Sequence, residues 1–241
     1  MGLFDIQRRY IAFDIETAKN LPAYLRGDLL SYRPLGITCA ATWCSDQHSP
    51  DVFYSKRGDG TPAPQMTRED LSTFIDHLTS KTKSGYTIVT HNGCGFDFDV
   101  LAEESGRLRD CQSLALAHVD MLFHFFCVKG FLISLDAAAK SLGKSKSAQV
   151  DGALAPQLWQ DGEHDAVLRY VAEDCRLTGE IAQAGEESQK IGWITRQGKL
   201  ANCDLPGGWL TVEQASRLPL PDTSWMDRPL PRSKFTAWLG R

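Results

Sequence analysis

The stretch RYIAFDIET, residues 9–17, decides the fold expected for this chain of 241 residues. Its apolar and β-branched residues predict a strand, and side chains two residues apart on a strand share one face. Asp14 and Glu16 therefore project from the same face of an otherwise apolar strand. Two carboxylates this close repel each other, and a divalent cation would relieve the repulsion. The alternative is an edge strand with one solvated face, which Tyr10 and Ala12 on that face make less natural.

The segments around this strand predict an α/β fold. Three strands come first and are followed by alternating helices and strands, an order that indicates a mixed β-sheet with helices on its faces. Ligands of such sheets usually bind at the strand ends. The run MLFHFFCV is interpreted as a strand, although periodicity alone does not separate a buried strand from a buried helix. The expected strands are 9–17, 36–44, 51–55, 86–90 and 121–128, and the expected helices begin at Thr67 and Ser134 or cover 98–105 and 163–184.

The long helix expected over residues 163–184 carries an acid on its apolar side. Apolar residues recur there at spacings of three and four, and Asp174 falls on the same stripe, one turn after Tyr170. An acid is costly to bury unless something pairs with it. The alternative is a charge at the edge of the buried stripe, which is common on amphipathic helices.

A third group of polar residues follows the strand expected at 86–90. In Asn92-Gly-Cys-Gly-Phe-Asp97, the two glycines let the backbone pass close to a ligand, while Asn92 and Asp97 supply an amide and a carboxylate. Alone, such a segment predicts only a turn. Taken together, Asp14, Glu16, Asp97 and Asp174 form an all-oxygen set without histidine. Such ligands suit magnesium or manganese rather than zinc, and they match what two-metal phosphoryl transfer needs.

FDIET, N-x-x-x-F-D and Y-x-x-x-D, in this order, resemble the three exonuclease motifs of the DnaQ-like (DEDD) superfamily. The resemblance implies a ribonuclease H-like fold and a 3′-to-5′ exonuclease that uses two divalent metal ions, Mg²⁺ or Mn²⁺. Because Tyr170 lies four residues before Asp174 and position 169 is arginine, the chain resembles the tyrosine branch. That branch includes RNase D, polymerase proofreading domains and predicted stand-alone exonucleases. The resemblance covers about residues 9–182.

The resemblance also implies roles for individual residues. Asp14, Glu16 and Asp174 would hold one metal ion, Asp14 would bridge to the second, and Asp97 would act mainly through water. A free tyrosine has a pKa of about 10, so the Tyr170 hydroxyl is expected to orient the attacking water rather than to act as a base. Substrate contacts are expected from Thr17, Asn92, Phe96 and Lys144, with core packing as the alternative for Phe96. Lys144 belongs to a basic stretch with Lys129, Lys140 and Lys146, which is either a phosphate track or ordinary solvated surface.

The expected partner is a nucleic-acid 3′ end, with DNA placed ahead of RNA as the substrate. One alternative is an RNase D-like or oligoribonuclease-like exoribonuclease, and another is a ribonuclease H-like endonuclease. A non-enzymatic alternative is a nucleic-acid-binding or partner-docking module in which the acids hold a structural cation.

The composition of the chain indicates how it would bind nucleic acid and in which compartment it would lie. The formal net charge of −4 argues against a protein held on nucleic acid by bulk charge. The sequence contains no apolar run close to the roughly 20 residues of a membrane span, and its N-terminus carries charges where a signal peptide would be apolar. The seven cysteines are scattered without a Cys-x-x-Cys pair, so we expect reduced thiols, no zinc site and a cytoplasmic protein.

The residues after 187 differ in composition from those before. We expect an exonuclease domain over 1–187 and a basic, Trp- and Pro-rich extension over 188–241. The extension holds eight Lys or Arg against four acids, and four of the six tryptophans. It is expected to contain a hairpin over 191–205 and a short helix capped by Thr211. It would hold the substrate strand, a second copy or a partner protein; the alternative is that its tryptophans only fasten it to the rest of the chain.

Overall fold

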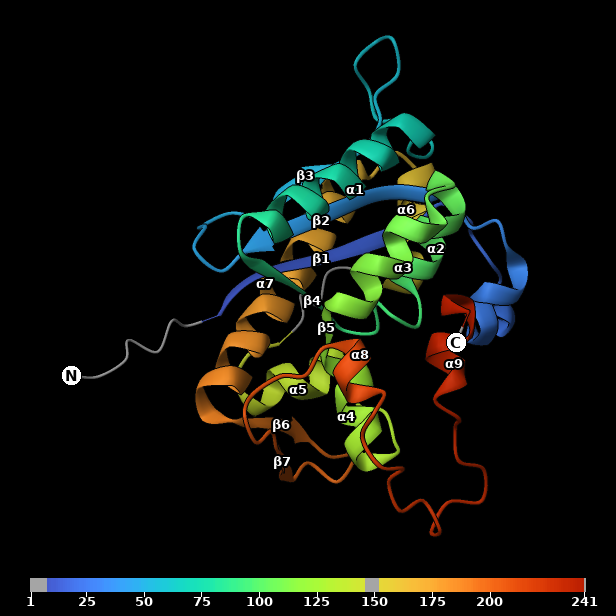
Figure 1. Ribbon diagram of the computed structural model, residues 1–241. Helices are drawn as coiled ribbons and strands as arrows, with labels where there is room; N and C mark the ends of the chain where they lie inside the picture. The colour runs from blue at the N-terminus through green and yellow to red at the C-terminus, as the bar shows by residue number, and fades with distance from the viewer. Residues whose placement is uncertain (1–7, 146–151, 241) are drawn as a thin grey trace, which may run out of the picture.

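The computed structural model describes residues 8–145 and 152–240, and its centre is a mixed β-sheet (Figure 1). The five strands lie in the order β3-β2-β1-β4-β5. β2 pairs antiparallel with β1 and β3, whereas β4 pairs parallel with β1 and β5. The prediction of a mixed sheet flanked by helices is therefore confirmed. The strands are β1 Arg9–Thr17, β2 Ile37–Cys44, β3 Asp51–Phe53, β4 Tyr86–Thr90 and β5 Val119–Asp120.

Helices cover both faces of this sheet (Figure 1). α1 (Arg68–Lys83), α2 (Asp97–Ser105) and α3 (Leu108–Ala117) lie on one face, and α7 (His164–Ser188) crosses the other. On the first face, the Phe13 ring packs edge-on against Phe74 of α1 and Phe98 of α2, with ring centroids 5.9 and 4.8 Å apart. In the described ranges, no helix has both the length and the apolar character of a membrane span. The other helices are α4 Met121–Lys129, α5 Leu135–Ser141, α6 Ala155–Gln160, α8 Val212–Ala215, α9 Ser233–Thr236, and the 3-10 turns η1 Ala23–Tyr32, η2 Gly152–Leu154 and η3 Ala237–Leu239.

The prediction of a strand over 121–128 is wrong, because this run forms α4. The Asp120 carboxylate caps the helix by accepting a hydrogen bond from the Phe123 amide at 3.0 Å, and Gly130 ends it in the left-handed region at φ 78°. Met121–Cys127 is buried on all sides. A run without a solvated face has no hydrophobic period, so its composition could not separate helix from strand.

The predicted helix starts at three other positions are confirmed. Thr67 accepts a hydrogen bond from the Asp70 amide at 3.1 Å, and Ser134 accepts one from the Ala137 amide at 3.1 Å. Thr211 forms a capping box with Gln214, in which each side chain bonds the other residue's backbone amide. These caps satisfy amides that the first turn of a helix leaves without an internal partner.

The chain after α7 packs onto the rest of the molecule. The predicted hairpin is confirmed as β6 (Lys190–Ile194) and β7 (Leu200–Asp204), and β6 packs against α5 and α7. Trp209 is only 1% exposed, and its indole N–H donates to the Ala182 carbonyl of α7 at 2.9 Å. Ile191, Leu205 and Leu239 belong to the same buried cluster as the sheet residues. These contacts fasten the extension across the helices.

Replacing Trp209 with alanine is expected to lower the free energy of unfolding by about 3–5 kcal/mol, the usual cost of truncating a buried aromatic side chain. Chemical denaturation would measure it. Trp225→Ala is the matched control, because Trp225 is 66% exposed and its loss should cost less than about 1 kcal/mol. Equal losses in both variants would contradict the packing described here.

Candidate active site

A cavity of about 660 Å³ opens where the carboxyl-terminal half of β1 meets α2 and α7. Its lining is drawn from segments far apart in the sequence. It includes eight of the nine residues that the motifs predicted as site residues: Asp14, Glu16, Thr17, Asn92, Phe96, Asp97, Tyr170 and Asp174.

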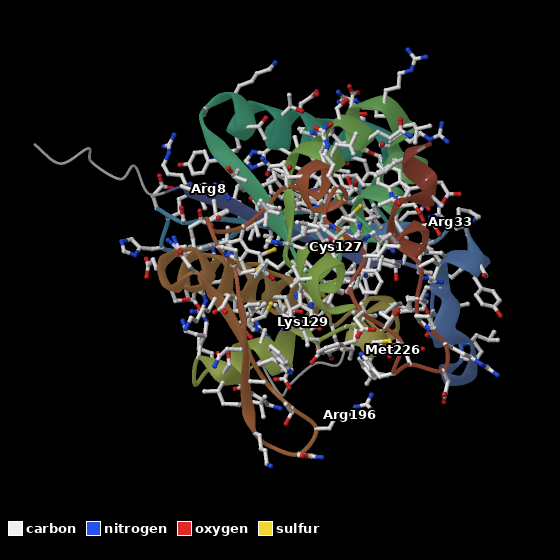
Figure 2. The ribbon with its side chains drawn as sticks, turned by 60° about the horizontal axis from the view of Figure 1, so that its bottom comes forward. Arg8, Arg33, Cys127, Lys129, Arg196 and Met226 are labelled. Carbon is white, nitrogen blue, oxygen red and sulfur yellow. The ribbon has the colours of Figure 1, made fainter. Side chains whose placement is uncertain are left out.

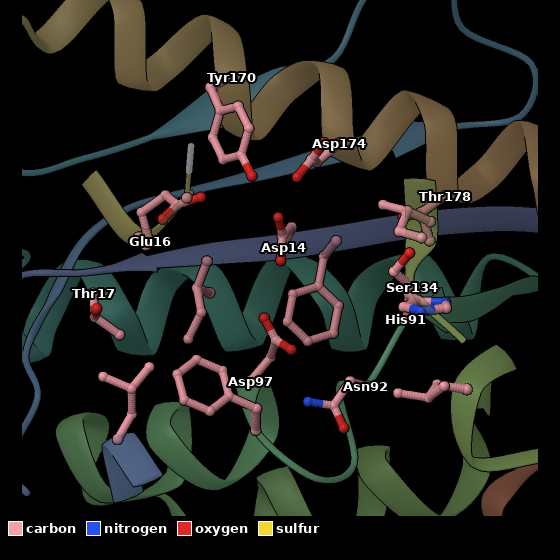
Figure 3. Close-up of a pocket in the computed structure, with 18 of the residues that line it drawn as sticks. Asp14, Glu16, Thr17, His91, Asn92, Asp97, Ser134, Tyr170, Asp174 and Thr178 are labelled. Atoms are coloured by element: carbon pink, nitrogen blue, oxygen red, sulfur yellow. The ribbon is translucent and has the colours of Figure 1, made fainter. Parts of the chain in front are cut away.

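The four acids face this cavity from three elements. Asp14 and Glu16 come from β1, Asp97 from the first turn of α2, and Asp174 from α7. Figure 3 shows their carboxylates pointing into the same space, with the Tyr170 hydroxyl directed there as well. Glu16, Asp97 and Asp174 are 5–7% exposed, so water screens their charges poorly.

The pairing of β1 with β2 is irregular next to the acids, and Thr38 of β2 is the extra residue. The pairing register between β1 and β2 shifts between Glu16 and Thr17, and the Thr38 hydroxyl donates to the Glu16 carbonyl at 3.1 Å across the bulge. A bulge redirects the side chains next to it. Thr17 lines the cavity beside Glu16.

The acids interact with one another directly. Burial raises the pKa of Asp97, although a hydrogen bond with the Asp14 carboxyl group partly offsets this effect. Two carboxylates this close repel each other unless a proton or a cation lies between them. Among the described residues, no three Asp, Glu, His or Cys side chains already form a metal-ion ligand set. These acids fit hard divalent cations by their chemistry.

The loop Asn92–Phe96, which leads into Asp97, is fixed by hydrogen bonds to Asp120. This buried carboxylate accepts hydrogen bonds from the Asn92 and Cys94 amides, both at 2.9 Å. Asn92 has a left-handed backbone at φ 84°, a conformation that asparagine tolerates better than most residues. The motifs did not indicate Asp120; its place directly before the apolar run MLFHFFCV is a signal that could have marked it.

His118 supports the same loop through Thr90. Its Nδ1 donates to the Ala115 carbonyl at 2.7 Å, so the neutral ring accepts from the Thr90 hydroxyl at Nε2, 3.0 Å away. The Thr90 oxygen in turn accepts from the Gly93 amide at 3.0 Å. Burial lowers the pKa of His118 to about 3, so the ring stays neutral in the folded protein.

This histidine predicts acid sensitivity. As the pH falls below about 6.5, His118 takes up a proton in the unfolded chain but stays neutral in the folded chain. This difference favours the unfolded chain, so His118 lowers the free energy of unfolding by roughly 1.4 kcal/mol for each pH unit below that value. The raised pKa values of Asp97 and Asp120 act in the opposite direction. We would therefore measure the free energy of unfolding between about pH 6.5 and pH 4 for the unmodified chain and for His118→Gln. The slope of this free energy against pH should be smaller in His118→Gln by roughly 1.4 kcal/mol per pH unit. Parallel curves would contradict this.

The C-terminal segment covers the outer side of the Asn92–Phe96 loop. The Trp238 indole donates to the Cys94 carbonyl at 2.7 Å, and Gln112 of α3 donates to the Trp238 carbonyl at 2.9 Å. A Cβ atom added to Gly95 would lie 2.8 Å from the Phe235 ring, so glycine permits this close approach. The loop is thus enclosed between Asp120 and the end of the chain.

Lys144 is the predicted substrate residue that lies outside the cavity lining. Its ammonium group forms an ion pair with Glu180 at 2.7 Å. Together with Asp174, it borders a smaller neighbouring hollow of about 250 Å³. Of the other lysines in the proposed basic stretch, Lys140 pairs with Asp136, and Lys146 lies outside the described residues. The lining also includes His91 and Lys19, which the motifs did not indicate.

The chain matches a known protein family. The sequence model of the RNase H superfamily matches residues 48–184, more than half of the chain. This chain belongs to the RNase H superfamily. The match includes Asp97, Tyr170 and Asp174, whereas Asp14 and Glu16 lie before its first residue. Membership of the RNase H superfamily supports a metal-dependent nucleic-acid hydrolase.

A solved structure shares the RNase H superfamily fold of this chain. The family B DNA polymerase from the hyperthermophilic archaeon Pyrobaculum calidifontis is similar to it with a TM-score of 0.54 and 24% sequence identity. The similarity covers 77% of this chain but 25% of the polymerase, and at this identity it supports the fold alone. No curated protein sequence matches the chain.

Proposed function

We propose that this chain is a 3′-to-5′ exonuclease that removes nucleotides from nucleic-acid ends by hydrolysis assisted by two divalent metal ions, Mg²⁺ or Mn²⁺. The observation that carries the proposal is the meeting of Asp14, Glu16, Asp97, Tyr170 and Asp174 around one cavity. A metal-dependent nucleic-acid hydrolase of the RNase H superfamily requires such a set of acids.

The size of the cavity supports action at an end. A volume of about 660 Å³ is typical of a site for a small ligand. It suits a terminal nucleotide better than the middle of a duplex. This favours an exonuclease over the endonuclease alternative.

The chain's own residues would divide the work as follows. Bound divalent cations would lower the pKa of the attacking water and neutralise charge that develops on the phosphate. Asp14, Glu16 and Asp174 would hold these ions, with Asp97 supporting them. The Tyr170 hydroxyl, directed toward the acids, would orient the water. Asn92, Thr17 and Phe96 line the same cavity and would contact the terminal nucleotide.

A panel of end-labelled substrates tests the proposal. Single- and double-stranded DNA and RNA, each labelled at the 5′ end, would be incubated with the protein and magnesium or manganese, beside Asp14→Ala. We expect the unmodified chain to shorten the labelled strands stepwise from the 3′ end, and we expect Asp14→Ala not to shorten them. Internal cuts would favour the endonuclease alternative, and no cleavage of any substrate would favour a binding module. The panel also decides between DNA, which we place first, and RNA.

Tyr170→Phe should lower kcat by about 10²-fold while leaving metal binding intact. The variant keeps the ring and removes only the hydroxyl, and positioning groups of this kind contribute about 10²-fold or more. Rates and a metal titration would measure the two effects. Tyr54→Phe is the matched control, because Tyr54 packs against Trp159 and does not border the cavity. An unchanged rate would make Tyr170 a packing residue of α7.

A further inference from the structure

Three aromatic side chains on the same side of the molecule form a connected group that the proposed chemistry does not use. Trp225 lies edge-on to Phe131 with ring centroids 6.2 Å apart, and Phe131 lies edge-on to Trp193 at 6.0 Å. Phe125 of α4 supports Trp193 from inside at 5.1 Å. We call Trp225, Phe131 and Trp193 the aromatic platform.

Trp225 is the exposed member of the platform, at 66% of its surface, whereas Phe131 and Trp193 are half-buried. A tryptophan buries a large apolar area when it packs, so one left mostly in water leaves an aromatic face available to a ligand.

The loop that carries Trp225 is fixed to the body of the protein. Gly130, at the end of α4, has no side chain, and an added Cβ would lie 2.4 Å from the Thr223 methyl group. The Met226 amide donates to the Thr223 carbonyl at 2.9 Å. Farther along the chain, the Arg232 guanidinium donates to the carbonyls of Leu218, Pro219 and Cys127. These contacts hold the indole in place beside Phe131, which lowers the entropy lost when a ligand stacks on it.

The platform is continuous with the cavity wall. Phe131 belongs to the platform, and the residues that follow it, Leu132 to Leu135, line the cavity. Leu132 is 46% exposed. The His91 ring hydrogen-bonds the Ile133 carbonyl at 3.0 Å, so this connecting segment is tied to the strand end that leads into the Asn92–Phe96 loop. This segment therefore joins the cavity wall to the platform.

The charges around the platform are mixed. Lys129 precedes Phe131 by two residues, and Figure 2 shows it with Arg196 and with Met226, the neighbour of Trp225, in the lower half of the view. Lys129 lies close enough to Cys203 of β7 to offset part of the rise in the pKa of that thiol that burial causes. The Trp225 loop adds two acids and one further cation, Asp222, Asp227 and Arg228. A surface with charges of both signs and an exposed indole suits the face of a base better than a row of phosphates.

We propose that the platform is a stacking site for a base of the single-stranded nucleic acid upstream of the 3′ end, with Trp225 as the stacking residue. The inference deepens the proposed function, because it assigns a second point of contact to the same substrate strand. Stacking on Trp225 would increase the number of nucleotides that the protein contacts, without any contact between Trp225 and the reacting phosphate.

Binding of phosphorothioate-linked, hydrolysis-resistant oligothymidylates in magnesium tests this, with fluorescence anisotropy as the readout. Base–aromatic stacking contributes about 1–3 kcal/mol, so Trp225→Ala should bind an oligomer of about ten nucleotides at least roughly 5-fold more weakly. Binding of the dinucleotide should not change, because it is too short to reach the platform. Trp225→Tyr should retain most of the affinity. Leu220→Ala is the matched control, since Leu220 is 79% exposed and precedes Trp225 by five residues.

The salt dependence separates stacking from charge. The loss in Trp225→Ala should be the same factor at about 50 and 200 mM salt, since no phosphate contact is removed. Unchanged affinity for the long oligomer in Trp225→Ala would overturn the inference, and so would an equal loss in Leu220→Ala or with the dinucleotide. Failure of the proposed function is distinguishable: Trp225-dependent binding without 3′ shortening would refute the exonuclease and leave the platform standing.

Discussion

Asp14→Ala is expected to reduce 3′-end hydrolysis by about 10³-fold or more. Asp14 lies on β1, the central strand of the sheet, and its carboxyl group is placed between those of the other acids. It also hydrogen-bonds the Asp97 carboxyl group. Its loss should therefore weaken the binding of both proposed metal ions. Removing a preorganised charge-stabilising group costs about 10²–10³-fold in enzymes, and loss of a metal ion costs more. Steady-state rates on the best substrate of the panel would measure this. Glu16→Ala and Asp174→Ala should behave alike.

Folding should survive these substitutions, because removing one of several mutually repelling carboxylates relieves repulsion. We expect a melting temperature equal to or above that of the unmodified chain. Asp165→Ala is the matched control: it removes the same charge from an exposed position in the first turn of α7. Near-normal rates in Asp14→Ala, Glu16→Ala or Asp174→Ala would show that the side chain concerned is not a primary metal ligand.

Removal of divalent cations should abolish activity completely and reversibly. The cavity presents oxygen ligands that suit magnesium and manganese, and phosphate hydrolysis without an ion would leave these carboxylates repelling the substrate. Activity should be absent in excess chelator and return when either ion is added back.

A second readout keeps this test independent of turnover. An ion that binds only the folded protein raises its melting temperature, so magnesium or manganese should raise that of the unmodified chain and not that of Asp14→Ala. Full activity in excess chelator would end the two-metal proposal. A thermal shift of equal size in Asp14→Ala would place the ion elsewhere.

The sequence predicted the elements whose physical signals are local. β1 was predictable because Asp14 and Glu16 interrupt an apolar strand at the period of a strand, and the helix starts were predictable because Thr67, Ser134 and Thr211 bond amides within their own turn. The meeting of the site residues at one cavity was predictable from three local patterns: the acids of β1, the polar loop that follows β4, and the polar positions on the apolar stripe of α7.

Features that depend on contacts distant in sequence were not predictable. Asp120 bonds a loop 26–28 residues away, and Trp238 bonds a carbonyl 144 residues away. α4 was missed for a different reason: it has no polar face, so its hydrophobic period could not separate a helix from a strand, although its Asp120 cap is local. The bulge after Glu16 depends on the register of β2, which no property of β1 determines.

The cover that Phe235 and Trp238 form over the Asn92–Phe96 loop has a consequence for the order of folding. Trp238 and Cys94 are 144 residues apart in the sequence, so their contact closes a long stretch of chain. Closing a long loop costs more entropy than forming a local contact, and contacts distant in sequence slow folding. We therefore expect the loop to receive its outer cover after the local helices and hairpins have formed.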